Sequence, residues 1–310
     1  MFHWTNASEK QRAKILLMMT AVLHGLFPIL MHAGTHVLPP LYFAAVYLLL
    51  ASLFPLLMLA GRGNIIRTAI PRHVLRDVVL VALLNLTIPT ALIAIGTRMT
   101  SGINTALLGQ AEMFFTFLVC NILLRQKTHA VRLVGALAVF LGTVLILFQS
   151  SRTLNTGDML IVLATAFYPF GNLVSKRLLE SLDVLTILFL RSLVAGLLLL
   201  GLSAIFEHIP SAIHATIDGA WWLIVLQAFF VLFLSKFLWY EGLKALSVSR
   251  ATFIVSSAPA WSLVFAVAFL GEVPDLAQLI GFGITLIGIF LLTARFMRQA
   301  PEAAWIETAI

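Results

Sequence analysis

The chain has 310 residues, of which 61% are hydrophobic and only 11% are charged. A soluble protein of this length needs more polar surface, so the composition excludes that class and indicates an integral membrane protein. The net charge of +7 does not indicate nucleic-acid binding, because the basic residues lie in short segments between apolar runs.

Ten apolar runs are long enough to cross a bilayer as helices, since a span needs about 20 residues. They lie at 13–33, 41–60, 77–97, 102–124, 131–149, 157–177, 184–206, 219–242, 249–270 and 276–294. The first follows a basic segment, as in a signal peptide, but no small-residue cleavage site closes it, and we expect a retained helix. The single cysteine, Cys120, lies within a run, which excludes a disulfide framework. Long continuous runs are not typical of barrel strands, so the sequence predicts an all-α membrane protein with ten transmembrane helices.

Lysine and arginine residues are distributed unequally between the two ends of these spans. Sixteen fall on one side: Lys10, Arg12, Lys14, Arg62, Arg67, Arg72, Arg76, Arg125, Lys127, Arg132, Lys176, Arg177, Lys244, Arg250, Arg295 and Arg298. Only Arg98 and Arg152 fall on the other side, while Arg191 and Lys236 lie inside spans. The positive-inside rule therefore predicts that both termini are cytoplasmic. On that side the glycosylation sequon at 6–8 would not be used.

A shift of 146 residues aligns the two halves of the chain. The segment LVGALAVFLGTVLIL at 133–147 overlays LIGFGITLIGIFLLT at 279–293. The glycines paired by this overlay are Gly135 with Gly281 and Gly142 with Gly288. Each half holds five spans, an odd number, so the second half would enter the membrane in the opposite orientation. Such an inverted repeat is typical of secondary transporters, and it predicts one repeat at 1–150 and another at 151–310.

The second half resembles the EamA domain of the drug/metabolite transporter superfamily. The match rests on GNLVSKRL, FLRSLVAG, FLWYEGLKALSVSRATFIVSSAPAWSLVFAVAFLGE and LIGFGITLIGIFLL. The resemblance implies two tandem copies, ten helices with both ends inside, and a relation to amino-acid and drug exporters. The first half departs from the pattern: Met113 replaces a proline, Arg125-Gln126 replaces Gly-Glu, and Ala45 occupies the position equivalent to Arg191. No particular substrate is therefore carried over from the family.

Glu112 lies near the middle of the fourth span, where a charge costs roughly 2.5–3.5 kcal/mol. Thr105, Gly109 and Thr116 share its helical face at spacings of three and four. Polar or amphipathic side chains recur at similar depth in other spans: His24, Asn85, Thr87, Tyr168, Asn172, Gln227, Ser256, Ser257 and Trp261. Four prolines are expected to break helices and free backbone carbonyls: Pro28, Pro89, Pro169 and Pro259. This tier predicts a central pocket for substrate binding or proton coupling.

Structural alternatives stay open for these residues. A buried carboxylate is usually paired, and the partners available to Glu112 are Arg191, Lys236 and His24. His24 could instead hydrogen-bond a neighbouring helix. For Arg191 the resemblance implies a gating or structural role, which we also assign to Lys236. Tyr168 and Trp261 serve packing as readily as ligand contact.

The chain contains no Walker loop, no metal-spaced His/Cys cluster and no nucleophile elbow, so neither an enzyme nor a cofactor or metal is indicated. We expect a secondary transporter that exports small metabolites, such as amino acids or amphipathic amines, across the cell inner membrane by alternating access. Its expected partners are a small-molecule substrate, the lipid bilayer and protons, with no nucleic acid, in a monomer or weak homodimer. The alternatives are a non-coupled facilitator of the same solutes, a non-transporting receptor or scaffold, and a membrane enzyme acting on lipid.

Overall fold

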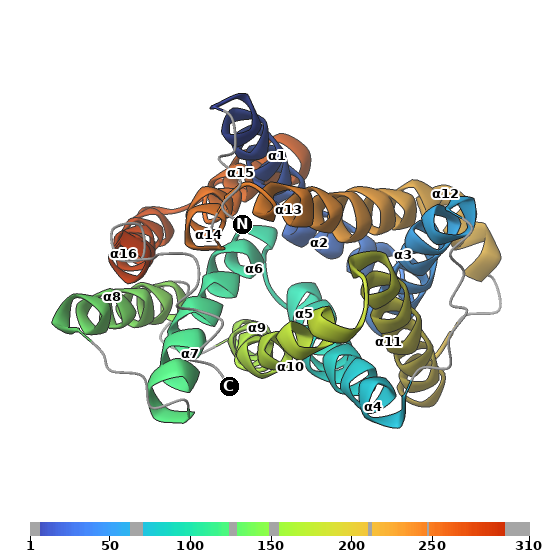
Figure 1. Ribbon diagram of the computed structural model, residues 1–310. Coiled ribbons are helices and arrows are strands. Elements are labelled where there is room, and N and C mark those ends of the chain that lie inside the picture. Colours follow the sequence, from blue (N-terminus) through green and yellow to red (C-terminus); the bar gives the residue numbers. More distant parts are fainter. Residues whose placement is uncertain are drawn as a thin grey trace.

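The structure is a computed structural model that describes residues 7–62, 71–123, 129–148, 155–209, 213–246 and 248–294. Within these ranges every regular element is a helix, and no β-strand occurs. Figure 1 shows the helices gathered into one bundle, with α8 beside α16 at one edge and α3 beside α11 at the opposite edge. The predicted all-α fold class is confirmed.

The first half of the chain forms eleven helical elements, in which η1 and η3 are π-helical and η2 is a 3-10 turn. They are α1 (Ala7–Gly25), α2 (Phe27–Val37), α3 (Pro40–Gly61), α4 (Arg72–Val81), η1 (Ala82–Thr87), α5 (Ile88–Arg98), α6 (Gly102–Leu108), η2 (Gly109–Ala111), α7 (Glu112–Leu118), η3 (Val119–Leu123) and α8 (Ala130–Leu147). Several of these elements follow one another without a loop, so they form longer interrupted spans.

The second half repeats this design with η4 and η5 as π-helical segments. Its elements are α9 (Thr156–Thr165), α10 (Tyr168–Ser181), α11 (Val184–Phe206), α12 (Ile213–Leu226), η4 (Gln227–Leu234), α13 (Ser235–Leu243), α14 (Val248–Val255), α15 (Ala258–Phe265), η5 (Ala266–Leu270) and α16 (Leu276–Ala294). The π-helical segments have no signature in the hydrophobic pattern, and the sequence did not predict them.

Nine helices in the described part of the chain are long and apolar enough to cross a membrane. They are Glu9–Val37, Pro40–Gly61, Arg72–Arg98, Gly102–Leu123, Ala130–Leu147, Thr156–Ser181, Val184–Phe206, Ile217–Leu243 and Leu276–Thr293. The remaining predicted run, 249–270, is divided by a turn at Ser256 and Ser257, which leaves the shorter apolar helix Ala258–Leu270. In their described residues the ten predicted runs are helical, and turns interrupt the first at 26, the sixth at 166–167 and the ninth at 256–257.

Four prolines occupy the second position of helices that begin within a span. They are Pro28 of α2, Pro89 of α5, Pro169 of α10 and Pro259 of α15. A proline has no N–H to donate and clashes with the preceding turn, so it is tolerated at a helix start and disrupts the helix before it. Each break lies next to residues of the polar tier.

The contact between α8 and α16 depends on glycines that let the two backbones approach closely. A β-carbon at Gly288 would lie 2.6 Å from the carbonyl oxygen of Gly135, and one at Gly281 would lie 3.0 Å from that of Gly142. The sequence overlay equates Gly135 with Gly281 and Gly142 with Gly288. Replacing each glycine by its counterpart in the other half therefore turns the contact of Gly288 with Gly135 into the contact of Gly142 with Gly281, as expected of an inverted repeat.

The largest apolar cluster packs α3 against α11, α12 and η4, with Phe43, Tyr47 and Leu48 almost fully buried. On another side of the bundle, α1 packs against α13, α14 and α15. This packing brings the span that carries His24 beside the span that carries Lys236.

Part of the predicted topology falls on residues that the structure does not describe. The basic residues concerned are Arg67, Arg125, Lys127, Arg152, Arg295 and Arg298, together with Asn6 of the sequon and Gln126. The placement of both termini in the cytoplasm therefore stays a prediction.

Candidate functional site

Four polar side chains from three spans form a continuous hydrogen-bonded chain, here called the central chain. The Asn172 side-chain amide donates to Glu112 Oε1 over 3.3 Å. The amide of Asn85 donates to Asn172 Oδ1 at 3.1 Å and to Ser175 Oγ at 3.2 Å. Glu112 and Asn85 belong to the first half and the other two residues to α10, so every link joins the two halves.

The helix breaks position the central chain. Glu112 opens α7 directly after the 3-10 turn η2, Asn85 lies in the π-helical segment η1, and Asn172 follows Pro169 in the first turn of α10. π-helical segments often occur at functional sites because the wider turn displaces side chains from regular helical positions. Asn85 also packs directly against Gly171, where a β-carbon would collide with its amide.

The central chain keeps unused polar capacity. Asn172 is exposed and Glu112 is half-buried, whereas Oδ1 of Asn85 is buried without a hydrogen-bond partner in the described part of the chain. A buried amide oxygen without a partner is uncommon in native structures, and this one is packed against Gly171. The arrangement can therefore hydrogen-bond a solute and can present one carboxylate to a cationic group.

Two basic side chains lie near this chain and are here called the basic pair. Lys236 of α13 is half-buried and interacts electrostatically with Glu112, with His24 and with Arg191. Arg191 of α11 is 8% exposed, and its Nε has no hydrogen-bond partner among the described residues. The ion pairs of the described chain involve other residues, so Glu112 has no contact ion pair there.

The remaining predicted site residues make local contacts. His24 lies in the last turn of α1 and stacks on Phe27, with ring centroids 6.1 Å apart. Tyr168 opens α10 and interacts electrostatically with Glu112. Ser257, in the turn between α14 and α15, donates to the carbonyl of Ile254 in α14.

Trp261 of α15 packs away from the central chain, in contact with α1. A β-carbon added at Gly25 would lie 2.8 Å from Cβ of Trp261, and the indole ring is tilted against Phe265 at 6.4 Å. Neither Ser257 nor Trp261 makes a hydrogen bond to the central chain in the described structure. The structure therefore joins Glu112, Asn85 and Asn172 directly and leaves these two on the α1 side.

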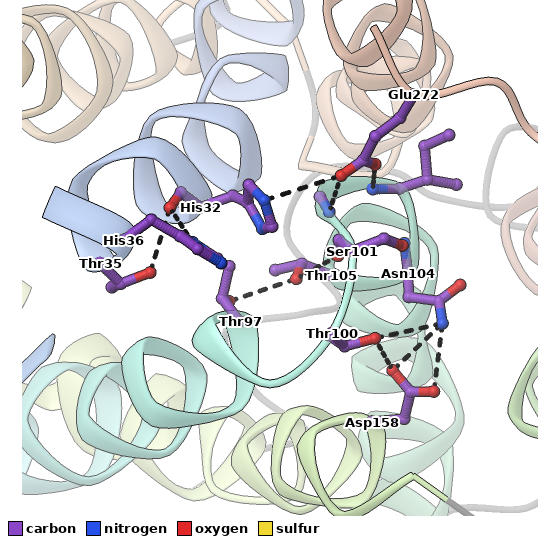
Figure 2. A network of polar contacts seen from close by, with 12 residues as sticks. His32, Thr35, His36, Thr97, Thr100, Ser101, Asn104, Thr105, Asp158 and Glu272 are labelled. Atoms are coloured by element: carbon purple, nitrogen blue, oxygen red, sulfur yellow. Dashed lines mark hydrogen bonds and ion pairs between the residues drawn. The ribbon is translucent and has the colours of Figure 1, made fainter. Parts of the chain in front are cut away.

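A second polar cluster, here called the Glu272 network, lies at the end of the bundle where α6, α9 and α16 begin (Figure 2). The carboxylate of Glu272 accepts backbone hydrogen bonds from Gly102 at 2.9 Å and Ile103 at 2.8 Å, and it lies 3.8 Å from Nε2 of His32. The first two N–H groups of α6 are thereby satisfied by a charged acceptor from the other half.

Asn104 forms the other centre of the Glu272 network. Its amide donates to both carboxylate oxygens of Asp158, at 3.2 and 3.1 Å, and its oxygen accepts from Gln278 at 2.8 Å. Thr100 completes the group with a 2.5 Å hydrogen bond to Asp158. Asn104 and Asp158 are 4% and 2% exposed, so this part of the network is shielded from solvent.

The sequence did not identify the Glu272 network because its polar residues lie at the ends of spans. There they resemble ordinary interfacial or capping residues, and their partners are distant in the chain. The polar stripe expected on the fourth span is also divided, since Thr105 bonds to Thr97 and to the Ser101 carbonyl before the 3-10 turn at η2.

A shallow apolar depression of about 450 Å³ runs along the outside of α1 between Lys14 and Leu23. It is lined by one helix and contains none of the polar tier. We attribute no solute site to it, because bilayer-facing apolar surface accounts for it.

The chain is similar to a family of membrane transporters. Residues 11–148 and 155–294 each match the model of the EamA-like transporter family. A Bacillus subtilis protein described as uncharacterized transporter YyaM is 23% identical over 68% of this chain and 70% of its own length. A second from that organism, uncharacterized transporter YoaV, is 22% identical over 87% of this chain and 92% of its own.

The fold also matches a solved crystal structure with a TM-score of 0.67 at 15% sequence identity, which covers 93% of this chain and 99% of the other. That identity supports the fold alone. Two family matches that together cover most of the chain, and helices long enough to span a bilayer, identify a multi-pass membrane protein. The chain belongs to the EamA-like transporter family.

Proposed function

We propose that the protein is a secondary transporter that exports a small metabolite across the cytoplasmic membrane by alternating access between two five-helix halves. The central chain is the observation that carries this proposal. It places a carboxylate, two amides and a hydroxyl at helix breaks within three spans, and every link crosses between the halves. Polar groups at mid-membrane are costly, and in transporters they mark the solute pathway.

The Glu272 network supports alternating access, because it closes one end of the interface between the halves. Counted along the fourth span, it lies about 15 Å from Glu112, since each helical residue rises about 1.5 Å. Asn104 is buried there, while Asn172 in the central chain is exposed. In our proposal this end is the outer gate, both termini are cytoplasmic, and the described conformation faces inward.

Glu112 has two possible roles within this mechanism, namely recognition of an amine or transfer of a proton. Its single hydrogen bond from Asn172 leaves the carboxylate with acceptor capacity for either role. The change Glu112→Gln separates them, because glutamine retains an acceptor for Asn172 but cannot ionise. A recognition role would reduce solute binding, whereas a coupling role would preserve binding and abolish accumulation driven by a pH gradient.

A thermal-shift screen of the detergent-purified protein tests the proposal. Wild type, Glu112→Gln and Glu180→Gln would be compared against amino acids, nucleosides, organic acids and amines; Glu180 is an exposed carboxylate on α10 and serves as the matched control. A solute that stabilises wild type and the Glu180 variant, but not the Glu112 variant, supports a binding site at the central chain.

The same preparation distinguishes the competing functions. A solute that accumulates in proteoliposomes only with a pH gradient supports proton coupling, and accumulation to equilibrium alone supports the non-coupled facilitator. The receptor or scaffold alternative would be favoured if a cysteine at position 112, in a Cys120→Ser background, resisted aqueous thiol reagents in membranes. Labelling at that position supports solute access.

A further inference from the structure

The charged groups of the polar tier do not balance. Within the described spans, Glu112 is the one carboxylate near the central chain, and it interacts electrostatically with Lys236, which also interacts with Arg191. Other nearby carboxylates are already engaged: Asp77 with Arg76 and Arg177, and Glu241 with Lys244. The region therefore carries an excess of one positive charge when Glu112 is ionised.

The two residues of the basic pair lie equally far from the ends of their helices. Arg191 is seven residues from Val184 at the start of α11, and Lys236 is seven residues from Leu243 at the end of α13. Both are thus about 10 Å from the ends of their helices along the axis. The two cations are close enough to repel each other, yet no carboxylate of the described chain contacts either.

Buried cations are normally paired with an anion, because desolvation is otherwise uncompensated. Nε of Arg191 is buried without an acceptor, although the residue is 92% removed from solvent. Lys236 interacts with Glu112 only at a distance beyond ion-pair contact. An anion that the chain itself does not supply would satisfy both groups.

We propose that the transported solute carries a carboxylate, which the basic pair binds and for which Lys236 is a specificity-determining residue. This inference rests on the proposed transport function and narrows it: the solute is an organic acid or a zwitterion, and a simple amine is not transported. In a zwitterion the ammonium group would contact Glu112 while the carboxylate contacts Lys236. Arg191, the more buried of the two, strengthens the attraction for the carboxylate.

The test compares solutes that share an apolar body and differ in charge. One set is 3-phenylpropionate, phenylalanine and phenethylamine; the other is 4-methylpentanoate, leucine and isoamylamine. Thermal shifts would be measured on the purified full chain as wild type, Lys236→Met, Lys236→Arg and Lys244→Met. Lys244 lies next to α13, is exposed and pairs with Glu241, so its variant controls for loss of a lysine charge.

We expect at least one acid or zwitterion to stabilise wild type and the Lys244 variant. Lys236→Met should weaken that binding at least tenfold, and Lys236→Arg should retain most of it. The apo form of Lys236→Met should melt no lower than wild type, since an unpaired cation is removed. A lysine held in a structural ion pair would instead lower the apo melting temperature when replaced.

Three results would overturn the inference. The first is stabilisation of wild type by the amines alone, which would leave a central site intact but assign it to cations. The second is equal binding of an acid to wild type and Lys236→Met. The third is that no acid or zwitterion in either set binds. Whether the protein transports any solute is measured separately, as flux of mixed metabolites in proteoliposomes. That result does not depend on the two sets of solutes compared above.

Discussion

The glycine contact between α8 and α16 gives a stability prediction whose magnitude follows from the geometry. In the variant Gly288→Ala the new methyl group would lie 2.6 Å from the Gly135 carbonyl oxygen and 2.7 Å from the Val139 nitrogen. Both obstacles are backbone atoms, which cannot rotate away as a flexible side chain can. The helices must separate, and overpacking of this kind typically destabilises by about 1–3 kcal/mol.

Gly283 on the same helix provides the matched control, because a β-carbon there meets nothing within 4 Å. Replacing this glycine by alanine should stabilise the helix by roughly 0.5–1 kcal/mol, since alanine loses less backbone entropy on folding. The two variants introduce the same methyl group into the same helix and are predicted to change stability in opposite directions.

Unfolding in a detergent titration, followed by far-ultraviolet circular dichroism, measures both effects. We expect Gly288→Ala to unfold at a lower denaturant fraction than wild type, and Gly283→Ala at an equal or higher one. Gly142→Ala should destabilise the protein as Gly288→Ala does, because the overlay of the two halves equates the two positions. Wild-type stability of Gly288→Ala would refute the close helix contact described here.

Three further predictions concern the two polar clusters. Glu272→Gln removes the charge that caps α6 at Gly102. A cysteine that replaces the buried Thr105, in a Cys120→Ser background, should then react faster with aqueous thiol reagents than the same cysteine in a protein that retains Glu272. An unchanged rate would contradict the outer-gate role. Asn104→Leu leaves the buried Asp158 carboxylate without its amide donor and should destabilise the folded protein by about 1–3 kcal/mol. The double variant with Asp158→Leu should recover part of this stability. Equal stability of the single variant and wild type would argue against the network. Glu112→Gln should reduce solute flux at least tenfold at every pH, and activity retained at wild-type level would remove Glu112 from the mechanism.

Much of the fold could be predicted because membrane insertion imposes a strong and local signal. The apolar runs gave the helices, since the bilayer requires backbone hydrogen bonds within each segment. The repeated glycine spacing at 133–147 and 279–293 predicted an inverted repeat, and the structure adds that these two segments pack against each other as α8 and α16. The ninth run was predicted as one helix, but Pro259 and the preceding turn divide it into α14 and α15.

The candidate site was predictable only where polarity and depth coincided. Glu112, Asn85 and Asn172 were conspicuous as polar residues in the middle of apolar spans, and the structure links them. The Glu272 network had no such signal, because polar residues are common at the ends of spans. Its partners, such as Asp158 and Asn104, are 54 positions apart, and a periodic pattern within one helix carries no information about them.

Flux through the purified protein shows whether solute crosses the membrane through the site around Glu112. Purified wild type and Glu112→Gln would be reconstituted in proteoliposomes loaded with a mixed pool of isotopically labelled metabolites, with protein-free vesicles as background. We expect saturable exit of at least one solute through wild type and at least tenfold slower exit through the variant. Exit no faster than from protein-free vesicles, or equal exit through both proteins, would contradict it.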